Sequence, residues 1–417
     1  MIDLRLLSTE PEYRQGAIDK GFSSELIDQI LADEESRRAG LVVVETLRAE
    51  SNAASKEIGR SAPEDRPARI EAAGELKKRL VVAEQQLEEL EQKVREVAIT
   101  VPNPAHESVP VGGEEAFRVE ETFGVAGPEP AFDHGSLGAK LGLVDTERAV
   151  RMSGSRFAYV MGDAVRLQFA LVQWTLEKLS NHGFVPVVTP ALVREEMMEL
   201  AGFFPTDRNQ VYELEKDELF LIGTAEVGLA GLHRGERLNA DEMPLRYAGY
   251  SSCFRREAGT YGKDTSGLFR VHQFDKVEMF VYTSPDKSWE ELELIRQMQS
   301  DIITSLDLPH RVITVASGDL GAAAAKKYDI EVWLPSEQRY REATSCSNYT
   351  DFSARRMGTR VKGETGTELA HTLNGTACAI GRTLLYIFEN HQQADGSVVV
   401  PEVLRPYCGG LELIKAS

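Results

Sequence analysis

Apolar residues recur at intervals of three and four positions between residues 70 and 97. A spacing that averages about 3.5 residues is typical of a helix that packs along one seam against another helix. The stripe consists of Ile70, Ala73, Leu76, Leu80, Ala83, Leu87, Leu90, Val94 and Val97. This segment is therefore predicted to form one long helix.

A second long helix is expected just before this stripe. Ser23 and Ser24 precede Glu25, a pattern typical of a helix start. The apolar residues of the charged run that follows lie roughly on one side, and residues 59–67, with two prolines, interrupt it. We expect an antiparallel helical hairpin about 45–50 Å long. From the stripe alone, the favoured interpretation is a coiled-coil dimerisation arm. The apolar positions of the first helix are Ile27, Leu31, Leu41, Val44 and Leu47.

The pattern changes at about residue 100. Residues 101–113 (VPNPAHESVPVGG) contain three prolines and no helical period, so they are predicted to form a linker. Beyond them, a helical stretch at residues 164–179 is accompanied by β-rich runs at 185–188, 277–282 and 311–315. We expect a helical hairpin (1–100), a linker (101–113) and a mixed domain (114–417).

Length and cysteine usage narrow the class of protein. A chain of 417 residues is too long for one ordinary core. No apolar run approaches the roughly 20 residues that span a bilayer, and the first residues do not resemble a secretion signal. The four cysteines contain no CxxC pair, so neither zinc nor a disulfide framework is expected. We expect a protein of the reducing cytoplasm.

The formal net charge of −19 argues against nucleic acid as a partner, because lysine and arginine drive phosphate binding. A nucleic-acid partner would therefore require a local basic face on an acidic body.

The densest polar stretch covers residues 253–279 (CFRREAGTYGKDTSGLFRVHQFDKVEM). The chain has neither GxxxxGK[ST] nor GxGxxG, so a bound nucleotide would have to be held by side chains. Arg255 and Arg270 flank a glycine-rich loop on two predicted antiparallel strands, and arginine suits phosphate because its fork donates paired hydrogen bonds. The alternative is a solvated hairpin held by salt bridges. His272 is expected to make a structural hydrogen bond, and Cys253 and Cys346 are expected to be packing residues.

Three segments in this order resemble the signature motifs of class II aminoacyl-tRNA synthetases, specifically the bacterial-type seryl-tRNA synthetase family. Residues 181–190 (NHGFVPVVTP) are similar to the first motif, 254–257 (FRRE) to the second, and 374–383 (NGTACAIGRT) to the third. Further segments typical of the family include SNAASKEIG (51–59), SGSRF (153–157), GTAEVGL (223–229), REATSCSN (341–348) and PEVLRPY (401–407).

The resemblance implies an α+β fold, with a central antiparallel sheet flanked by helices and an N-terminal hairpin that binds tRNA. It implies an enzyme that joins L-serine to ATP, releases pyrophosphate, and transfers serine to the 3′ end of serine tRNA. Selenocysteine tRNA stays open as a second acceptor. It also implies a homodimer whose interface includes residues 181–190.

The same resemblance implies roles for individual residues. Arg255 would bridge the serine carboxylate and the α-phosphate, with Arg382 as the second catalytic arginine. Phe274 and Arg382 would sandwich the adenine, and Arg270 would hold the terminal phosphates. Glu342 and Ser345 would carry Mg²⁺, which prefers oxygen ligands. The serine site would comprise Thr224, Ala225, Glu226, Arg255, Glu278, Asn374 and Thr376. The ATP site would comprise Arg255, Arg256, Glu257, Arg270, Val271, Phe274, Glu342, Ala343, Thr344, Ser345 and Arg382.

Basic residues of the hairpin are candidate contacts to tRNA phosphates, although such clusters are more often solvated helix faces. They are Arg37, Arg38, Arg48, Lys56, Lys77, Lys78 and Arg79.

Two other interpretations are open. A relative that charges a protein carrier with an amino acid would be expected to lack the helical arm, which this chain has. A non-catalytic scaffold protein would be expected to have lost Arg255, Glu278 or Arg382, and all three are present.

Overall fold

The computed structural model describes residues 2–259, 267–363 and 366–415. The chain forms two compact units, residues 1–104 and 105–417, and each is described by itself. Residues 260–266 of the predicted glycine-rich loop lie outside the described residues.

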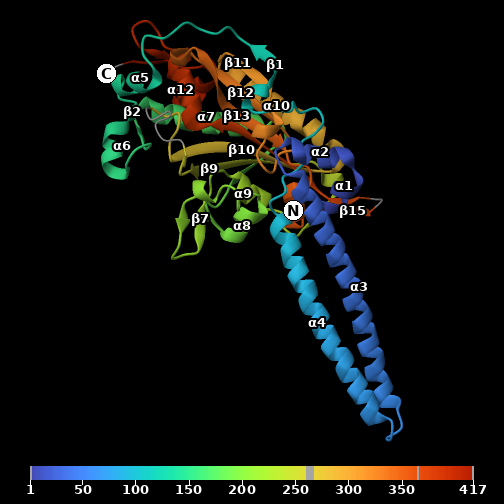
Figure 1. Ribbon diagram of the computed structural model, residues 1–417. Helices are drawn as coiled ribbons and strands as arrows, with labels where there is room; N and C mark the ends of the chain where they lie inside the picture. The colour runs from blue at the N-terminus through green and yellow to red at the C-terminus, as the bar shows by residue number, and fades with distance from the viewer. Residues whose placement is uncertain (1, 260–266, 364–365, 416–417) are drawn as a thin grey trace. The chain divides into compact units, whose positions relative to one another are not determined.

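The first unit is dominated by two long helices that run side by side (Figure 1). α3 (Ser24–Arg60) has 37 residues and α4 (Arg66–Ala98) has 33, which corresponds to about 55 and 50 Å. The Ser23 hydroxyl accepts a hydrogen bond from the Leu26 N–H and caps α3, and a proline in the first turn opens α4. The predicted hairpin is confirmed. Two short helices precede it, α1 (Leu4–Thr9) and α2 (Pro11–Asp19).

The predicted stripe forms the seam of this hairpin. Leu87 and Val94 are buried, and the other members from Ala73 onward are half-buried, whereas Ile70 is 58% exposed. Four ion pairs cross between the helices: Asp33–Lys93, Arg37–Glu91, Arg48–Glu84 and Glu57–Arg69. Asp33 is buried, but most of the other partners are exposed, and exposed pairs stabilise weakly. Apolar packing along the seam is therefore the main source of the hairpin's stability.

The second unit is built on a mainly antiparallel sheet of eight strands among the described residues. Only β4 pairs in parallel with its neighbour β9; the other pairs within this described sheet are antiparallel. This confirms the predicted α+β fold. In spatial order the strands are β1 (Arg118–Phe123), β11 (His310–Thr314), β12 (Lys326–Leu334), β13 (Arg339–Asn348), β16 (His371–Ala379), β10 (Gln273–Thr283), β9 (Leu245–Phe254) and β4 (Val185–Val188).

Helices and smaller sheets surround the main sheet. The helices are α5 (His134–Lys140), α6 (Thr146–Ser153), α7 (Asp163–Ser180), α8 (Glu195–Leu200), α9 (Glu226–Ala230), α10 (Ser288–Ser305), α11 (Phe352–Met357) and α12 (Ile380–Asn390). The smaller sheets join β5 (Leu192–Arg194), β7 (Leu219–Leu221) and β6 (Glu213–Leu214); β15 (Gly366–Leu369), β14 (Arg360–Gly363) and β8 (Arg237–Asn239); β2 (Val144–Asp145) and β3 (Tyr159–Val160); and β17 (Val398–Val399) and β18 (Leu413–Ile414). Within the described parts of the chain, no helix is both long enough and apolar enough to cross a membrane.

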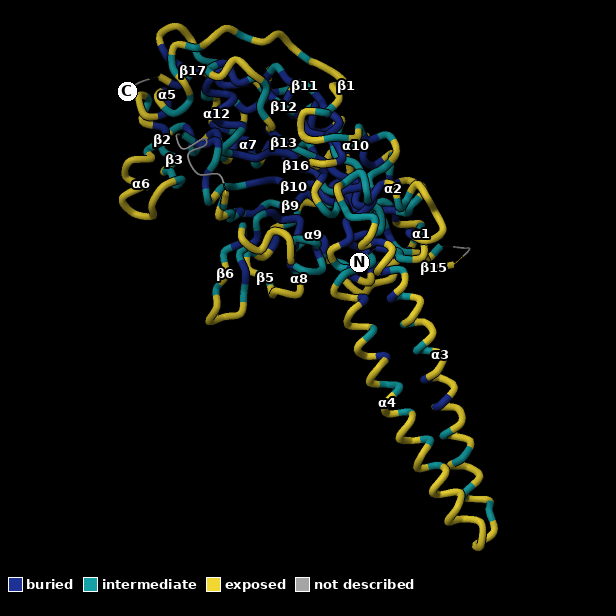
Figure 2. The backbone as a smooth tube through the Cα atoms, viewed as in Figure 1, coloured by how far each residue is buried: buried dark blue, intermediate teal, exposed yellow. Residues whose placement is uncertain are grey.

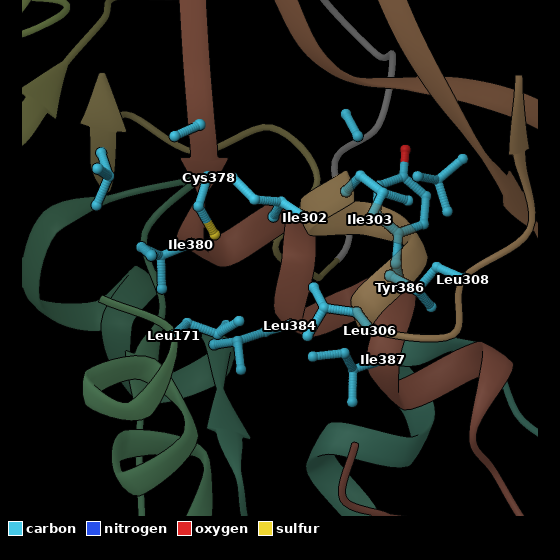
Figure 3. Packing of buried hydrophobic residues seen from close by; sticks show 14 of the residues in the cluster. Leu171, Ile302, Ile303, Leu306, Leu308, Cys378, Ile380, Leu384, Tyr386 and Ile387 are labelled. Atoms are coloured by element: carbon cyan, nitrogen blue, oxygen red, sulfur yellow. The ribbon is translucent and has the colours of Figure 1, made fainter. Parts of the chain in front are cut away.

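One face of the main sheet carries the larger apolar core, and Figure 2 shows how strongly burial concentrates in this unit. Ile302 of α10 and Leu306, the residue after this helix, pack in this core with Leu384 and Ile387 of α12 and Leu171 of α7 (Figure 3). A second core on the other side packs Phe280 and Tyr282 of β10 against α8, α9 and α11. The strands between the two cores are therefore buried on both faces.

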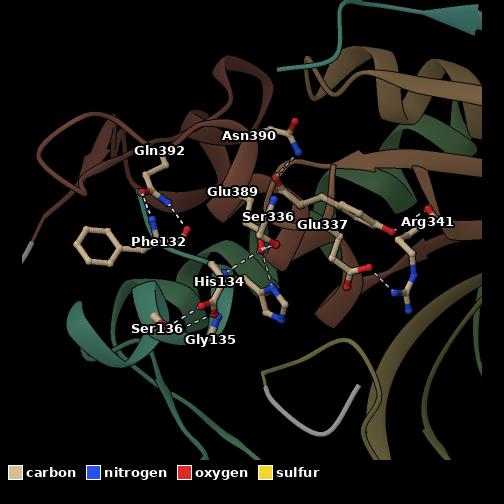
Figure 4. A network of polar contacts seen from close by, with 12 residues as sticks. Phe132, His134, Gly135, Ser136, Ser336, Glu337, Arg341, Glu389, Asn390 and Gln392 are labelled. Atoms are coloured by element: carbon tan, nitrogen blue, oxygen red, sulfur yellow. Dashed lines mark hydrogen bonds and ion pairs between the residues drawn. The ribbon is translucent and has the colours of Figure 1, made fainter. Parts of the chain in front are cut away.

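A buried carboxylate holds the far end of α12 in place. Glu389 accepts hydrogen bonds from the main chain and side chain of both His134 and Ser336, at 2.7–2.9 Å (Figure 4). Burial alone would raise the pKa of Glu389, but these hydrogen bonds outweigh it and its pKa lies below its usual value. The contacts tie α12 to α5 and to the segment after β12.

Candidate active site

A polar cavity of about 220 Å³ lies on the face of the sheet formed by β10, β13 and β16. Its walls come from segments far apart in the sequence, which supply both acidic and basic side chains. The described residues that line it are Phe203, Thr224, Glu226, Arg255, Glu257, Leu268, Phe269, Arg270, Val271, Phe274, Lys276, Glu278, Glu342, Ala343, Thr344, Ser345, Tyr349, Asn374, Thr376, Ala379, Gly381 and Arg382.

The alternation of β10 divides its residues between the cavity and the core. Phe274, Lys276 and Glu278 face the cavity, because side chains two positions apart lie on the same face of a strand. Val277 and Met279 point the other way into the larger core. Glu278 lies opposite Thr376 of β16, where the register shifts by one residue at Ala377. This β-bulge lets Thr376 and Asn374 face the cavity beside Glu278.

Two buried glutamates form the floor of the cavity. Glu278 Oε2 is 2.5 Å from Lys276 Nζ and accepts hydrogen bonds from Thr376 Oγ1 at 3.2 Å and Thr224 Oγ1 at 3.4 Å. Glu226 accepts a hydrogen bond from Asn374 Nδ2 at 2.7 Å and another from the Tyr349 hydroxyl. The floor therefore carries more acidic than basic groups and suits a ligand with an ammonium group.

A glycine allows the helix that carries Glu226 to approach the sheet. Gly249 of β9 lies beside α9, and a Cβ atom there would be 2.7 Å from Leu229 Cδ1 and 3.1 Å from Ala225 Cβ. Because glycine has no Cβ, α9 can pack directly on β9. Glu226, at the start of α9, consequently lies in the cavity.

The pKa of Glu226 lies well above the usual value of a glutamate. Burial and the nearby charge of Glu278 raise the pKa of Glu226 to about 7, and this effect exceeds the opposing influences of Lys276, Tyr349 and Asn374. Near neutral pH, Glu226 therefore changes charge state, and a cationic ligand beside it would favour its ionised form.

Arg255 and Arg270, from the polar stretch 253–279, enter the cavity beyond Phe274, at the end of β10 away from Glu278. The Arg255 guanidinium donates through Nε to the Gly223 carbonyl at 3.2 Å and lies over the Phe274 ring, 5.3 Å from its centre. Arg270 forms an ion pair with Glu257 at 3.0 Å. His272 Nδ1 contacts the Arg255 carbonyl at 2.9 Å, which confirms the predicted structural hydrogen bond. These contacts fix the neighbouring ends of β9 and β10, from which Arg255 and Arg270 enter the cavity.

Strand β13 brings four consecutive residues, 342–345, to the cavity wall. Residues three apart on a regular strand point to opposite faces, but the pairing with β12 shifts by one residue at Ala343. This bulge lets both Glu342 and Ser345 reach the cavity. Arg382, in the first turn of α12, donates to the Glu342 carbonyl at 3.0 Å and lies 3.6 Å from its carboxylate.

Glu342 and Ser345 fit the chemistry of Mg²⁺. Loss of water around the Glu342 carboxylate would raise its pKa, but the charges of Arg382, Lys327 and Arg255 outweigh this and hold the pKa below its usual value. Within residues 2–259, 267–363 and 366–415, no group of three or more His, Cys, Asp or Glu side chains could hold a metal. A carboxylate and a hydroxyl leave room for substrate phosphates and water, which is the usual arrangement for Mg²⁺.

Most residues predicted for the serine and ATP sites come together in this cavity, but two lie outside its described lining. Ala225 is fully buried beside Gly249. Arg256 points away, donates to the Val211 carbonyl at 2.9 Å and lies over the Tyr212 ring. Cys253 and Cys346 are buried and free, as expected of packing residues.

Sequence reasoning missed several lining residues. Lys276 could have been found, because it lies two positions before Glu278 on the same strand face. Tyr349 carries no such local signal, since it follows the end of β13. The other members that the sequence did not indicate are Phe203, Leu268, Phe269, Ala379 and Gly381.

The seven basic residues of the helical hairpin that are candidate tRNA contacts fall into two groups. Arg37 and Arg38 pair with Glu34, Arg48 with Glu84, and Lys78 with Glu75. Lys56, Lys77 and Arg79 are exposed and form no ion pair with the described residues. The second group is therefore more available to a phosphate ligand.

Family models match both units. The seryl-tRNA synthetase N-terminal domain matches residues 1–105, and the class II core domain of the G, H, P, S and T tRNA synthetases matches residues 210–391.

Individual relatives match along the full chain. Serine–tRNA ligase 1 of Streptomyces avermitilis is 46% identical over 100% of this chain and 99% of its own length. A crystal structure of seryl-tRNA synthetase from Pyrococcus horikoshii, complexed with ATP, superposes with a TM-score of 0.94 at 38% identity and covers 100% of both chains. The cytoplasmic serine–tRNA ligase of Naegleria fowleri, in complex with AMP, has a TM-score of 0.90 at 32% identity over 100% of this chain and 99% of that chain. The agreement extends from the helical hairpin to the motifs that line the cavity, and the chain belongs to the seryl-tRNA synthetase family of class II aminoacyl-tRNA synthetases.

Proposed function

We propose that this protein is a serine–tRNA ligase, which activates L-serine with ATP and transfers it to serine tRNA. The observation that carries the proposal is a single cavity with an acidic floor, Glu226 and Glu278, and arginines toward its other end. The floor suits an amino-acid ammonium, and the arginines suit phosphate. End-to-end similarity to serine–tRNA ligases supports the same conclusion.

Activation requires no general base, because the serine carboxylate is already ionised at neutral pH. A carboxylate oxygen attacks the α-phosphorus in line, and the bond to the bridging oxygen breaks as pyrophosphate leaves with the electron pair. Arg255 would bridge the serine carboxylate and the α-phosphate and counter the developing negative charge. In the second step, the terminal ribose hydroxyl of tRNA attacks the carbonyl carbon and AMP leaves.

Recognition of serine is assigned to the floor of the cavity. Glu226 and Glu278 would bind the ammonium, while Thr224, Asn374 and Thr376 would complete a polar wall around the hydroxyl. A site built to hydrogen-bond a hydroxyl rejects an analogue that lacks it, because its own buried groups are left without partners. Alanine should therefore be a poor substrate.

Recognition of ATP is assigned to residues at the paired ends of β9 and β10, to strand β13 and to the first turn of α12. Phe274 and Arg382 would enclose the adenine, Glu257 and the Val271 main chain would lie at its edge, and Arg270 would hold the terminal phosphates. Glu342 and Ser345 would hold Mg²⁺, which when bound neutralises phosphate charge. The oxygen donors that these two residues bring to the wall support this assignment.

The proposed setting is the cytoplasm, and the proposed partner of the helical arm is serine tRNA. Selenocysteine tRNA is a second candidate acceptor, because it would be charged by the same chemistry. One assay tests the central proposal: serine-dependent exchange of pyrophosphate into ATP, followed by charging of total tRNA. Exchange with tRNA charging supports it, exchange without charging would favour a carrier-protein acceptor, and no exchange would favour a scaffold protein.

The catalytic assignment of Arg255 is tested by Arg255→Ala. Losing a donor that faces developing charge costs roughly 3–4 kcal/mol, so the exchange rate should fall about 10²–10³-fold. Arg151→Ala, which removes an exposed arginine paired with Glu147, serves as the control and should retain activity. Near-normal exchange by Arg255→Ala, with an intact circular dichroism spectrum, would refute the assignment.

The acidity of Glu226 predicts a pH-dependent serine affinity. Above pH 7 the carboxylate is ionised and attracts the ammonium, whereas below pH 7 it takes up a proton. The KM for serine should therefore rise about tenfold between pH 8 and pH 6, while the KM for ATP changes little. Glu226→Gln should raise the serine KM throughout and abolish this dependence. A flat wild-type serine KM over this range would contradict the prediction.

A homodimer is proposed, with an interface that includes residues 181–190. Val185 and Val188 of β4 are 55% and 79% exposed, and Phe169 on the adjacent helix α7 is 60% exposed. Large apolar side chains left open on one strand and its neighbouring helix suit a partner surface. Sedimentation at micromolar concentration should show a dimer, and Val188→Asp should weaken it. Wild-type protein that sediments only as a monomer would exclude this interface.

Deletion of residues 24–97 should separate the two half-reactions. The cavity is lined entirely by described residues of the second unit, so exchange should persist within a few-fold. Charging should collapse if the arm grips tRNA. Substituting Lys77 and Arg79 with alanine in the full chain should weaken tRNA binding and reduce its salt dependence, by about one unit in slope per lost contact. Full charging by the truncated enzyme would show that the arm is a spacer or a dimerisation element.

A further inference from the structure

Lys276 is a buried lysine on the floor of the cavity with no role in the assignments above. Its exposed fraction is 6%. Its Nζ lies 2.5 Å from Glu278 Oε2 and donates to Thr376 Oγ1 at 3.4 Å. An ammonium group held this far from water requires compensation by a neighbouring negative charge.

The charges on the floor balance only when Lys276 is included. Glu226 and Glu278 contribute two negative charges when both are ionised, and an amino acid brings one ammonium. A buried carboxylate without a counter-charge is strongly unfavourable. Lys276 supplies the second positive charge, so that the loaded floor is neutral.

The contacts of Glu278 are also one-sided. Lys276, Thr224 and Thr376 all contact Oε2. Oε1 makes no hydrogen bond with any described residue, although Glu278 lines the cavity. Oε1 is therefore the oxygen available to a ligand, and the three contacts to Oε2 hold the carboxylate in that orientation.

We propose that Lys276 is a positioning residue that determines specificity for serine: it neutralises one of the two floor carboxylates and holds Glu278 with Oε1 toward the substrate. The inference rests on the proposed function. It follows that the site accepts an amino acid with one ammonium and a neutral side chain. A second ammonium in place of the serine hydroxyl would have to compete with Lys276.

The test compares two variants in the full-length chain. Lys276→Ala removes the charge and leaves space, whereas Lys276→Met removes the charge and fills most of the space. Both should raise the KM for serine about 100-fold, with the KM for ATP within about threefold, because Glu278, left buried without its partner, is no longer held with Oε1 toward the substrate. Ethylammonium in the buffer should restore serine binding to Lys276→Ala and not to Lys276→Met.

A substrate analogue gives an independent readout. In L-2,3-diaminopropionate an amino group replaces the serine hydroxyl. Both variants should shift preference from serine toward this analogue by at least about tenfold relative to the wild type. Isothermal titration with each amino acid measures the shift without requiring turnover, and thermal melting checks that the variants fold.

The outcomes separate this inference from the proposed function. Wild-type protein without serine-dependent exchange would reject the function itself. Wild-type exchange, together with variants that keep the serine KM, would overturn the role of Lys276 alone. Folded variants with a raised KM, no rescue by ethylammonium and no shift toward the analogue would reduce Lys276 to a packing residue and also overturn the inference.

Discussion

The antiparallel register of β9, β10 and β16 is the constraint on which the rest of the second unit depends. It places Glu278 between Gly249 and Thr376. On one face of β10, Glu278 therefore lines the cavity and Phe280 packs in the second apolar core. The other face is buried in the main core. A slip of one residue would exchange these faces and bury the charged groups in apolar surroundings, which is strongly unfavourable.

The cavity separates charge along its length. Buried carboxylates lie on the floor, and guanidinium groups lie near the paired ends of β9 and β10 and at the start of α12. Such an arrangement is costly in the empty protein, because each charge has lost part of its hydration. Internal partners reduce that cost: Lys276 beside Glu278, Glu257 beside Arg270, and Glu342 beside Arg382. A ligand with an ammonium at one end and phosphates at the other complements both regions.

The helical arm is stabilised by simpler means. Its two long helices share one narrow seam, and most of the remaining surface is exposed (Figure 2). Many of its basic side chains are already paired with acids of the same or the facing helix. The acidic balance of the whole chain does not exclude contact with an anionic partner, since cations that form no ion pair with the described residues, such as Lys77 and Arg79, can form a local site.

The sequence by itself determined the local periodicities and the order of the motifs. A 3.5-residue apolar repeat specified the hairpin, because seam packing depends on neighbours three and four positions apart. The three motifs and the further segments typical of the family indicated the family and most of the cavity lining. Only the tertiary structure joined Asn374 to Glu226, 148 positions apart, and added Tyr349. It also rotated Glu342 and Ser345 to one face through a bulge and placed Arg256 outside the cavity. Bulges and long-range contacts depend on which strands pair, and no local pattern encodes that pairing.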